Sequence, residues 1–217
     1  PISAISLLSE ALQVALYDPE QVKKFAANLQ RESKRLGALV TKIIQLSRIQ
    51  AGDLKGEIAV FDLGHVIDEA VELNQFLADS RGVRISADTP SGIMVDGDSE
   101  LISMALKNLI ENAVLYSEAN SNVGIGLSVV DDFAEVAVID KGIGIPVEHQ
   151  ERIFERFYRV DPSRSRDTGG TGLGLSIVKH AANNHGGEVT LFSKPNLGST
   201  FTFRIPIHQE NQSEDDK

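Results

Sequence analysis

A long run of apolar residues on a heptad grid restricts the fold of this chain more than any other feature of its sequence. Between residues 19 and 51 these positions fall on one face of an α-helix, with Glu32 as an interruption. Asp18 is a good N-cap, Pro19 suits the first helical position, and Gln21 completes a capping-box pattern. We expect the helix to end near Ala51-Gly52. Its apolar positions are Val22, Phe25, Leu29, Leu36, Leu39, Ile43 and Leu46.

A shorter amphipathic stretch precedes this helix and ends at the Tyr17-Asp18-Pro19 break. Two helices joined by so short a turn lie antiparallel. The first helix is expected to have about four turns and the second helix about eight or nine. The far half of the second helix therefore has no partner within its own hairpin. We therefore expect the first helix to continue upstream of Pro1, and the hairpin to dimerise into a four-helix bundle. The alternative is a monomeric hairpin packed on the rest of the chain. The first stripe comprises Ile2, Ile5, Leu8, Leu12, Ala15 and Leu16.

From Phe61 the pattern changes to short strands mixed with helices. Asp62 caps a helix that runs to about Ser80, and further helices are expected at 99–116 and 172–185. Mixed strands with helices on one face predict a two-layer α/β sandwich. The expected strands are 83–87, 93–96, 123–130, 133–139, 188–193 and 199–207.

These patterns divide the chain into a hairpin at 1–52, a linker at 53–61, a globular domain at 62–208 and a disordered acidic tail at 209–217. The chain has no cysteine, which excludes disulfides and cysteine metal sites and fits a reducing compartment. Its net charge of −10 argues against a surface for nucleic acid or anionic membrane. No apolar run is long enough to span a bilayer, and no signal peptide is visible.

Two asparagines, Asn108 and Asn112, lie one turn apart on a helix that is otherwise apolar. Amides in such a place need partners. They are either satisfied core amides or oxygen ligands for Mg²⁺, a hard cation that bridges phosphates.

Two glycine-containing segments follow. Asp140 ends an apolar strand, where a lone carboxylate needs a donor such as an exocyclic adenine amine, and Gly142 and Gly144 permit a turn against a flat ligand; a plain strand-to-loop turn is the alternative. The second segment, GGTGLGLSIVKH, leads glycines straight into a helix and predicts a phosphate site. The polar residues 160–170 before it are typical of a mobile lid.

Aromatic residues precede that lid. Phe154, Phe157 and Tyr158 are core aromatics or part of the site, and Arg159 could reach a phosphate from the base of the lid. The segment Gly198 to Phe201 opens the last strand beside the expected adenine pocket.

Five motifs together resemble the sensor histidine kinases of bacterial two-component systems, in order and in spacing. They are Asn108-x-x-x-Asn112, Asp140-x-Gly142-x-Gly144, Phe154 to Phe157, Gly170-x-Gly172-x-Gly174 and Gly198-Ser-Thr200. The resemblance covers nearly the whole chain and is greatest to the phosphate-responsive branch of actinobacteria. It implies a dimerisation and histidine-phosphotransfer hairpin, a Bergerat-type ATP-binding fold, and the cytoplasmic portion of a membrane-anchored sensor that phosphorylates a response regulator.

The resemblance also implies roles for individual residues. Asn112 is similar to the Mg²⁺ ligand, with Asn108 beside it, and Asp140 to the adenine-binding aspartate. Arg159 matches a γ-phosphate contact, so Asn112 and Arg159 are the implied catalytic residues. Where relatives often carry a lysine or arginine, this chain has Leu115. The remaining implied nucleotide contacts are Tyr116, Gly142, Gly144, Ile145, Gly170, Thr171, Gly172, Leu173, Gly174, Leu175 and Thr200.

Two other functions share this fold. ATPase relatives activate water with a glutamate four residues before the metal asparagine, but here that position is Asn108, an amide that cannot act as a base. Glu111 points about 100° around the helix and does not substitute easily. The sequence therefore favours phosphoryl transfer over hydrolysis, with a non-catalytic nucleotide-binding scaffold as the third interpretation.

The phosphoacceptor histidine is expected just upstream of Pro1, because Pro1-Ile2 matches the end of the family's phosphotransfer motif. The five histidines of this chain all lie beyond the hairpin, and none is followed by an acidic residue and a nearby Thr-Pro. We expect this chain to bind ATP without phosphorylating itself. The five are His65, His149, His180, His185 and His208.

Overall fold

A computed structural model describes residues 2–14, 18–51, 58–161 and 171–209 of the chain. The chain forms two compact units, Pro1–Leu54 and Lys55–Lys217. Several sequence expectations lie outside the described residues: Ala15, Leu16, Gly52 and Gly170, the side chains of Leu39, Ile43 and Leu46, and the tail from 210.

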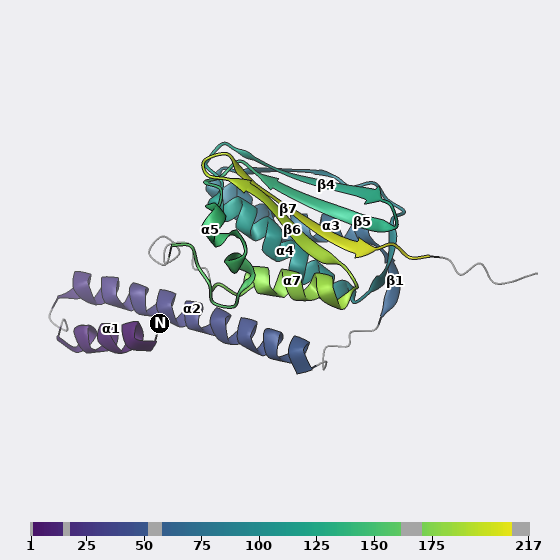
Figure 1. Cartoon of the computed structure of the whole chain (residues 1–217). Helices are drawn as coiled ribbons and strands as arrows, with labels where there is room; N and C mark the ends of the chain where they lie inside the picture. Colours follow the sequence, from purple (N-terminus) through teal and green to yellow (C-terminus); the bar gives the residue numbers. More distant parts are fainter. Residues whose placement is uncertain (1, 15–17, 52–57, 162–170, 210–217) are drawn as a thin grey trace, which may run out of the picture. The chain divides into compact units, whose positions relative to one another are not determined.

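The first unit is a helical hairpin of α1, Ile2–Val14, and α2, Pro19–Ala51 (Figure 1). Asp18 caps α2 as expected, since its Oδ1 accepts the N–H groups of Glu20 at 3.1 Å and Gln21 at 3.2 Å. The Gln21 side chain donates to the Asp18 carboxylate at 2.9 Å instead of returning to the Asp18 backbone. None of the described hairpin side chains is fully buried, so the apolar stripe is only half covered within one copy.

The second unit is built on a five-stranded sheet with the order β2-β4-β5-β7-β6. β2 runs parallel to β4, and the other neighbours are antiparallel. These strands are β2 Arg84–Asp88, β4 Asn122–Val130, β5 Phe133–Asp140, β6 Glu188–Lys194 and β7 Gly198–Pro206.

Three helices lie together against one face of this sheet, as Figure 1 shows: α3 Leu63–Arg81, α4 Ser99–Tyr116 and α7 Gly174–Asn184. The alternation of buried and exposed residues along β4, β5 and β7 turns Val123, Val136 and Phe203 toward these helices. Apolar residues of α4, such as Leu106 and Leu109, complete this core. The two-layer α/β sandwich predicted from the sequence is confirmed.

Three short elements were not expected. β1, Ala59–Asp62, pairs antiparallel with β3, Met94–Gly97, and lies where the sequence analysis placed a linker. α5, Val147–Gln150, and the 3₁₀ turn η1, Arg152–Phe154, connect β5 to the segment before α7. The expected helix over 172–185 begins at Gly174, because Gly172 has the left-handed φ of 72°.

Candidate functional site

Asp140 is the buried carboxylate of the site. It ends β5 opposite Ser199 of β7, and 6 % of its surface is exposed. Its Oδ1 accepts the backbone N–H of Gly142 at 2.8 Å and that of Ser199 at 3.2 Å. Burial raises the pKa of Asp140, and hydrogen bonds from the Gly142 backbone and from the Ser199 backbone and side chain oppose that rise only in part. Both backbone N–H groups donate to Oδ1, so Oδ2 can accept from a ligand.

The turn after Asp140 needs glycine at two positions because other backbone passes close to it. A Cβ on Gly142 would meet the carbonyl of Tyr116, and one on Gly144, whose φ is 65°, would meet the carbonyl of Lys194. The close approach of neighbouring backbone therefore requires glycine at both positions of this turn. Tyr116, at the end of α4, is 37 % exposed.

The register of β7 decides which of its side chains face Asp140. Thr200 pairs with Ile139 and Phe192, and it therefore lies on the face of the sheet opposite to Asp140. Its neighbour Ser199 shares the face of Asp140 and donates to it. The strand period of two is the physical reason, and it makes Ser199 the site residue of β7.

The asparagines of α4 lie against the beginning of α7. Asn108 is 7 % exposed and donates through Nδ2 to the carbonyl of Met104 at 2.7 Å. Its Oδ1 would lie 2.8 Å from a Cβ on Gly174, so a larger residue there would require the Asn108 side chain to shift. Asn112, one turn later on the same face, is half-buried, and its amide makes no hydrogen bond within the described residues. The satisfied-amide interpretation therefore fits Asn108, and Asn112 has a free oxygen.

The beginning of α7 offers unpaired backbone N–H groups. Leu173, its N-cap residue, is fully buried and provides no side-chain cap. The N–H groups of the first turn, from Gly174 and Leu175 onward, have no partner within the helix. Together with the helix dipole they form an anion site, to which Thr171 is adjacent.

A hydrogen bond joins the segment that precedes residue 162 to Gly172. The N–H of Phe157, which has a φ of 63°, donates to the carbonyl of Gly172 at 2.8 Å. Phe154 is half-buried and packs edge-on against Phe201 of β7, with ring centroids 6.4 Å apart. Phe157 is 57 % exposed, and Arg159 is half-buried two residues later. Gly170 lies outside the described residues.

Two further residues hold the glycine turn, and the sequence analysis missed both. The Ser193 hydroxyl accepts the N–H of Ile145 at 2.8 Å, and the Gln150 amide donates to the carbonyl of Ile145 at 2.8 Å. They lie 48 and 5 residues from Ile145, and no periodic pattern in the sequence marks them.

Comparison with known proteins identifies the family. Residues 97–209 match "Histidine kinase-, DNA gyrase B-, and HSP90-like ATPase", and residues 1–52 match "His Kinase A (phospho-acceptor) domain". The chain belongs to the sensor histidine kinases. The resemblance stated from the motifs is thereby confirmed.

Relatives of this sensor histidine kinase chain include the sensor-like histidine kinase SenX3 of Mycolicibacterium smegmatis, 43 % identical over all of this chain and 56 % of that protein. Sensor histidine kinase RppB of Synechocystis is 33 % identical over 94 % of this chain and 45 % of that protein. The chain thus spans about half the length of these curated relatives.

Solved structures have the same fold. Histidine kinase ThkA in complex with response regulator protein TrrA covers 96 % of this chain with a TM-score of 0.73 and 25 % identity, and this chain covers 58 % of it. Full-length ShkA in complex with AMPPNP covers 96 % of this chain with a TM-score of 0.71 and 25 % identity, and this chain covers 44 % of it. Among the described residues of our chain, no helix is long and apolar enough to cross a membrane.

Proposed function

We propose that the second unit binds Mg·ATP and that the chain is a protein-histidine kinase core, which moves the γ-phosphoryl group to a histidine and then to an aspartate of a response regulator. The contact of Asn108 with Gly174 carries this proposal. It brings the asparagine face of α4 and the uncapped beginning of α7 together at one place. A metal ligand and a phosphate site are then adjacent, as Mg·ATP requires.

Each part of the site has one task. Oδ2 of Asp140 accepts the exocyclic amine of adenine, and the bare backbone at Gly142 and Gly144 lies along the base. The first-turn N–H groups of α7, with Arg159, hold the phosphates. The amide oxygen of Asn112 is the protein ligand for Mg²⁺. When bound, Mg²⁺ neutralises charge on the transferring phosphoryl group.

Phosphoryl transfer fits these side chains better than hydrolysis. Hydrolysis needs a base near the phosphates, and the position one turn before Asn112 is occupied by Asn108, whose amide nitrogen already donates to Met104. An ATPase is therefore the weaker candidate. A non-catalytic nucleotide-binding scaffold would use the same residues to bind ATP but would transfer no phosphoryl group.

The helical hairpin of the first unit supports two partners, a second copy of the chain and a response regulator. The half-covered apolar stripe of the hairpin supports a homodimer that closes as a four-helix bundle. The phospho-acceptor match over residues 1–52, and the named complex of ThkA with a response regulator, support a receiver domain as the second partner. We propose a membrane-anchored sensor of the phosphate-response branch as the whole protein, on the resemblance to that branch and the 43 % identity to mycobacterial SenX3.

The Mg²⁺ assignment predicts the behaviour of Asn112→Ala. Calorimetric titration of wild type with ATP should give tighter binding in Mg²⁺ than in EDTA. The variant should lose most of this difference, because its protein ligand for the metal is gone, and should keep its affinity for ATP in EDTA. Asn183→Ala, at an exposed position of α7, is the matched control. If wild type bound ATP equally well in Mg²⁺ and in EDTA, the assignment of Asn112 as the Mg²⁺ ligand would be rejected.

A further inference from the structure

The peptide group of Ile145 is held by side chains on both of its sides. Ile145 follows the glycine turn and belongs to no strand. The Ser193 hydroxyl on β6 accepts its N–H at 2.8 Å, and the Gln150 amide at the end of α5 donates to its carbonyl at 2.8 Å. Ser193 is itself fixed, since it is 8 % exposed and lies 3.0 Å from both the carbonyl of Gly198 and the hydroxyl of Ser199.

Gln150 uses one nitrogen for two carbonyls. Its Nε2 donates to Ile145 at 2.8 Å and to the Ser193 carbonyl at 3.0 Å. An amide NH₂ has two donors, so both are engaged. Because both partners are acceptors, only the nitrogen of the amide can face them. The side chain thereby ties α5, the glycine turn and the end of β6 to one another.

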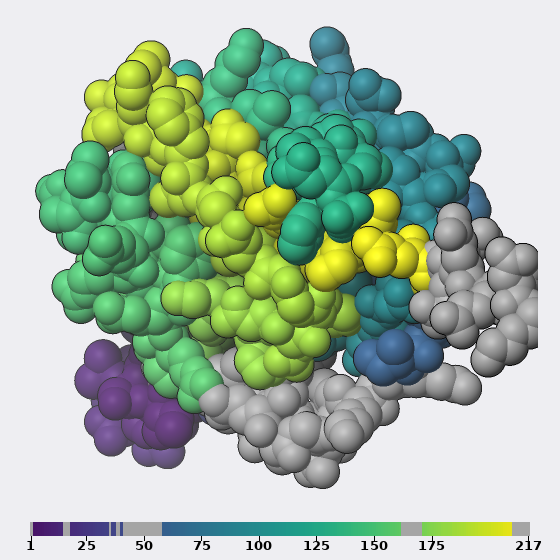
Figure 2. Space-filling model, turned by 45° about the vertical axis from the view of Figure 1, so that its right-hand side comes forward, coloured from purple at the N-terminus to yellow at the C-terminus, as the bar shows by residue number. Residues whose placement is uncertain are grey.

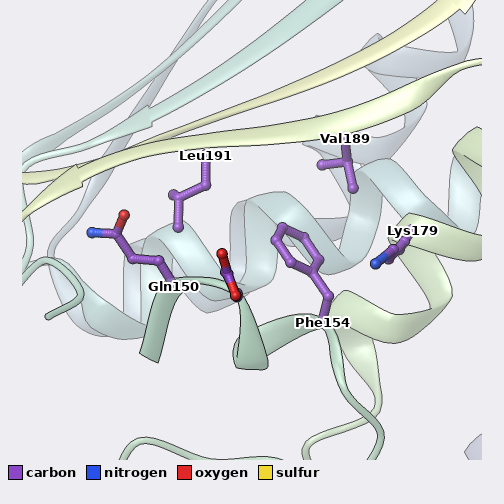
Figure 3. A pocket seen from close by; sticks show the side chains of 6 residues that line it. Gln150, Phe154, Lys179, Val189 and Leu191 are labelled. Carbon is purple, nitrogen blue, oxygen red and sulfur yellow. The ribbon is translucent and has the colours of Figure 1, made fainter. Parts of the chain in front are cut away.

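Gln150 also lines a groove between η1, α7 and β6, with a volume of about 520 Å³. Figure 3 shows Gln150 at one end of this groove and Lys179 at the other, with Phe154 between them and Leu191 and Val189 above. Figure 2 shows the green surface of the segment around residues 145–160 beside the yellow-green surface of the segment around residues 175–190. Gln150 is half-buried where α5 meets the end of β6, so a shift of either element would move its amide relative to Ile145.

We propose that Gln150 and Ser193 form a clamp that positions the glycine turn for adenine, and that Gln150 is a positioning residue for nucleotide selectivity. This inference rests on the proposed function, because it assigns adenine to Asp140. The turn lies directly between Asp140 and Ile145, so loosening Ile145 moves Gly142 and Gly144 relative to the carboxylate. Asn112 and the first turn of α7 receive no hydrogen bond from either clamp residue within the described part of the chain. The clamp therefore acts on the base and not on the phosphates.

The test compares ADP with GDP on the full chain. Calorimetry gives the Kd of ADP, and displacement of a fluorescent ADP analogue gives that of GDP. Gln150→Leu and Gln150→Glu remove the donors, and Ser193→Ala removes the other half of the clamp. Each should raise the Kd of ADP about five- to tenfold, the loss typical of one or two neutral hydrogen bonds. The Kd of GDP should change less than about twofold, so that the preference for adenine falls.

Gln150→Lys keeps N–H donors on a side chain of sufficient length and should restore both the ADP affinity and the preference. Glu151→Gln, an exposed neighbour on the same groove, is the matched control and should leave both unchanged. The clamp would be overturned if Gln150→Leu and Ser193→Ala folded and kept the wild-type preference for ADP over GDP. It would also be overturned if both variants lost affinity equally for ADP and for GDP. If wild type bound ADP no better than GDP, the adenine site itself would be wrong and the clamp would fall with it.

Discussion

Asp140 holds its proton to a higher pH in the folded protein than in the unfolded chain, because burial disfavours its charged form. Its contribution to stability is therefore full below the unfolded pKa of 3.8 and is lost as the pH rises through the raised folded pKa. Above the raised folded pKa the ionised carboxylate destabilises the fold. A residue that costs stability in this way is typical of a functional site.

Asp140→Asn should separate binding from stability. The asparagine oxygen can still accept from Gly142 and Ser199, but its NH₂ group would face the amine of adenine, a donor against a donor. We expect the Kd of ADP to rise about tenfold or more, as for a lost charged hydrogen bond. The melting temperature at pH 7 should stay equal to that of wild type or exceed it.

The advantage of Asp140→Asn in melting temperature should shrink as the pH falls through the raised folded pKa, where wild-type Asp140 becomes protonated. Asp88→Asn, at an exposed position of β2, is the control for loss of one negative charge. Equal ADP affinity in wild type and Asp140→Asn, measured by calorimetry, would remove Asp140 from the site.

The sequence predicted the site residues whose chemistry is unusual for their place, and missed those whose chemistry is ordinary. Asp140 at a strand end and Asn108 on an apolar helix stand out because a polar group there needs a partner. Ser193 and Gln150 are common residues in unremarkable positions, and only the fold brings them to Ile145. Thr200 was predicted from a motif, and a motif gives spacing, whereas the strand register decides which side chain faces inward.

At the scale of elements, the glycine turn and the end of α4 approach so closely that a methyl group should separate them. In Gly142→Ala the new Cβ would overlap the Tyr116 carbonyl. We expect the free energy of unfolding to fall by about 1–3 kcal/mol, the usual result of overpacking, and ADP binding to weaken as the turn shifts. Denaturant unfolding and calorimetry measure the two effects.

Gly126→Ala is the matched control, because a Cβ on this β4 glycine meets nothing within 4 Å. It should change the free energy of unfolding by no more than about 0.5 kcal/mol and leave ADP binding unaltered. If the two alanine variants behaved alike, the close approach of turn and helix would not matter.

The cap of α2 should make the hairpin sensitive to acid. The N–H of Gln21, followed by its side-chain amide, lowers the pKa of Asp18. The cap therefore stabilises the helix above pH 3.8, and this stabilisation is lost as the pH falls through the lowered folded pKa. Asp18→Ala should lower the melting temperature of the hairpin at pH 7 and have little effect in acid, once the pH is below the lowered folded pKa of Asp18.

Asp18→Ser keeps a neutral cap and should show weaker pH dependence than wild type. Circular dichroism at 222 nm follows the helix during heating. An Asp18→Ala difference that is the same at both pH values would show that the Asp18 charge does not contribute.

Long and periodic elements were predictable, and short ones were not. α4 was expected at 99–116 and is Ser99–Tyr116, because Asp98 caps it and its apolar face repeats over five turns. β1 and α5 have four residues each, too few for a period to show. β1 forms because it pairs with β3, more than thirty residues away in the chain, which no local pattern indicates.

For the whole molecule, the two units divide the proposed reaction between them. The second unit holds the candidate nucleotide site, and the hairpin supplies the surface on which two copies would meet. A phosphoacceptor must be a histidine, and residues 1–52 contain none. Hydrogen bonds join His149 to Tyr158, His185 to Asp98 and Ala181, and His208 to Asp96 in the second unit.

We therefore predict that residues 1–217 bind ATP without becoming phosphorylated, yet can phosphorylate a second chain in a mixed dimer. In the second, longer chain a segment with the family's phosphotransfer histidine is fused ahead of Pro1 and combined with Asp140→Asn, so that its own site is impaired. In mixtures with γ-labelled ATP, acid-labile label should appear on the longer chain and only when residues 1–217 are present. Leu8→Glu, on the half-covered stripe of α1, should abolish this label by preventing mixed dimers while leaving ADP binding intact. Label on residues 1–217 would contradict the assignment of the phosphoacceptor, and label that persists in the Leu8→Glu variant would contradict dimerisation through the hairpin.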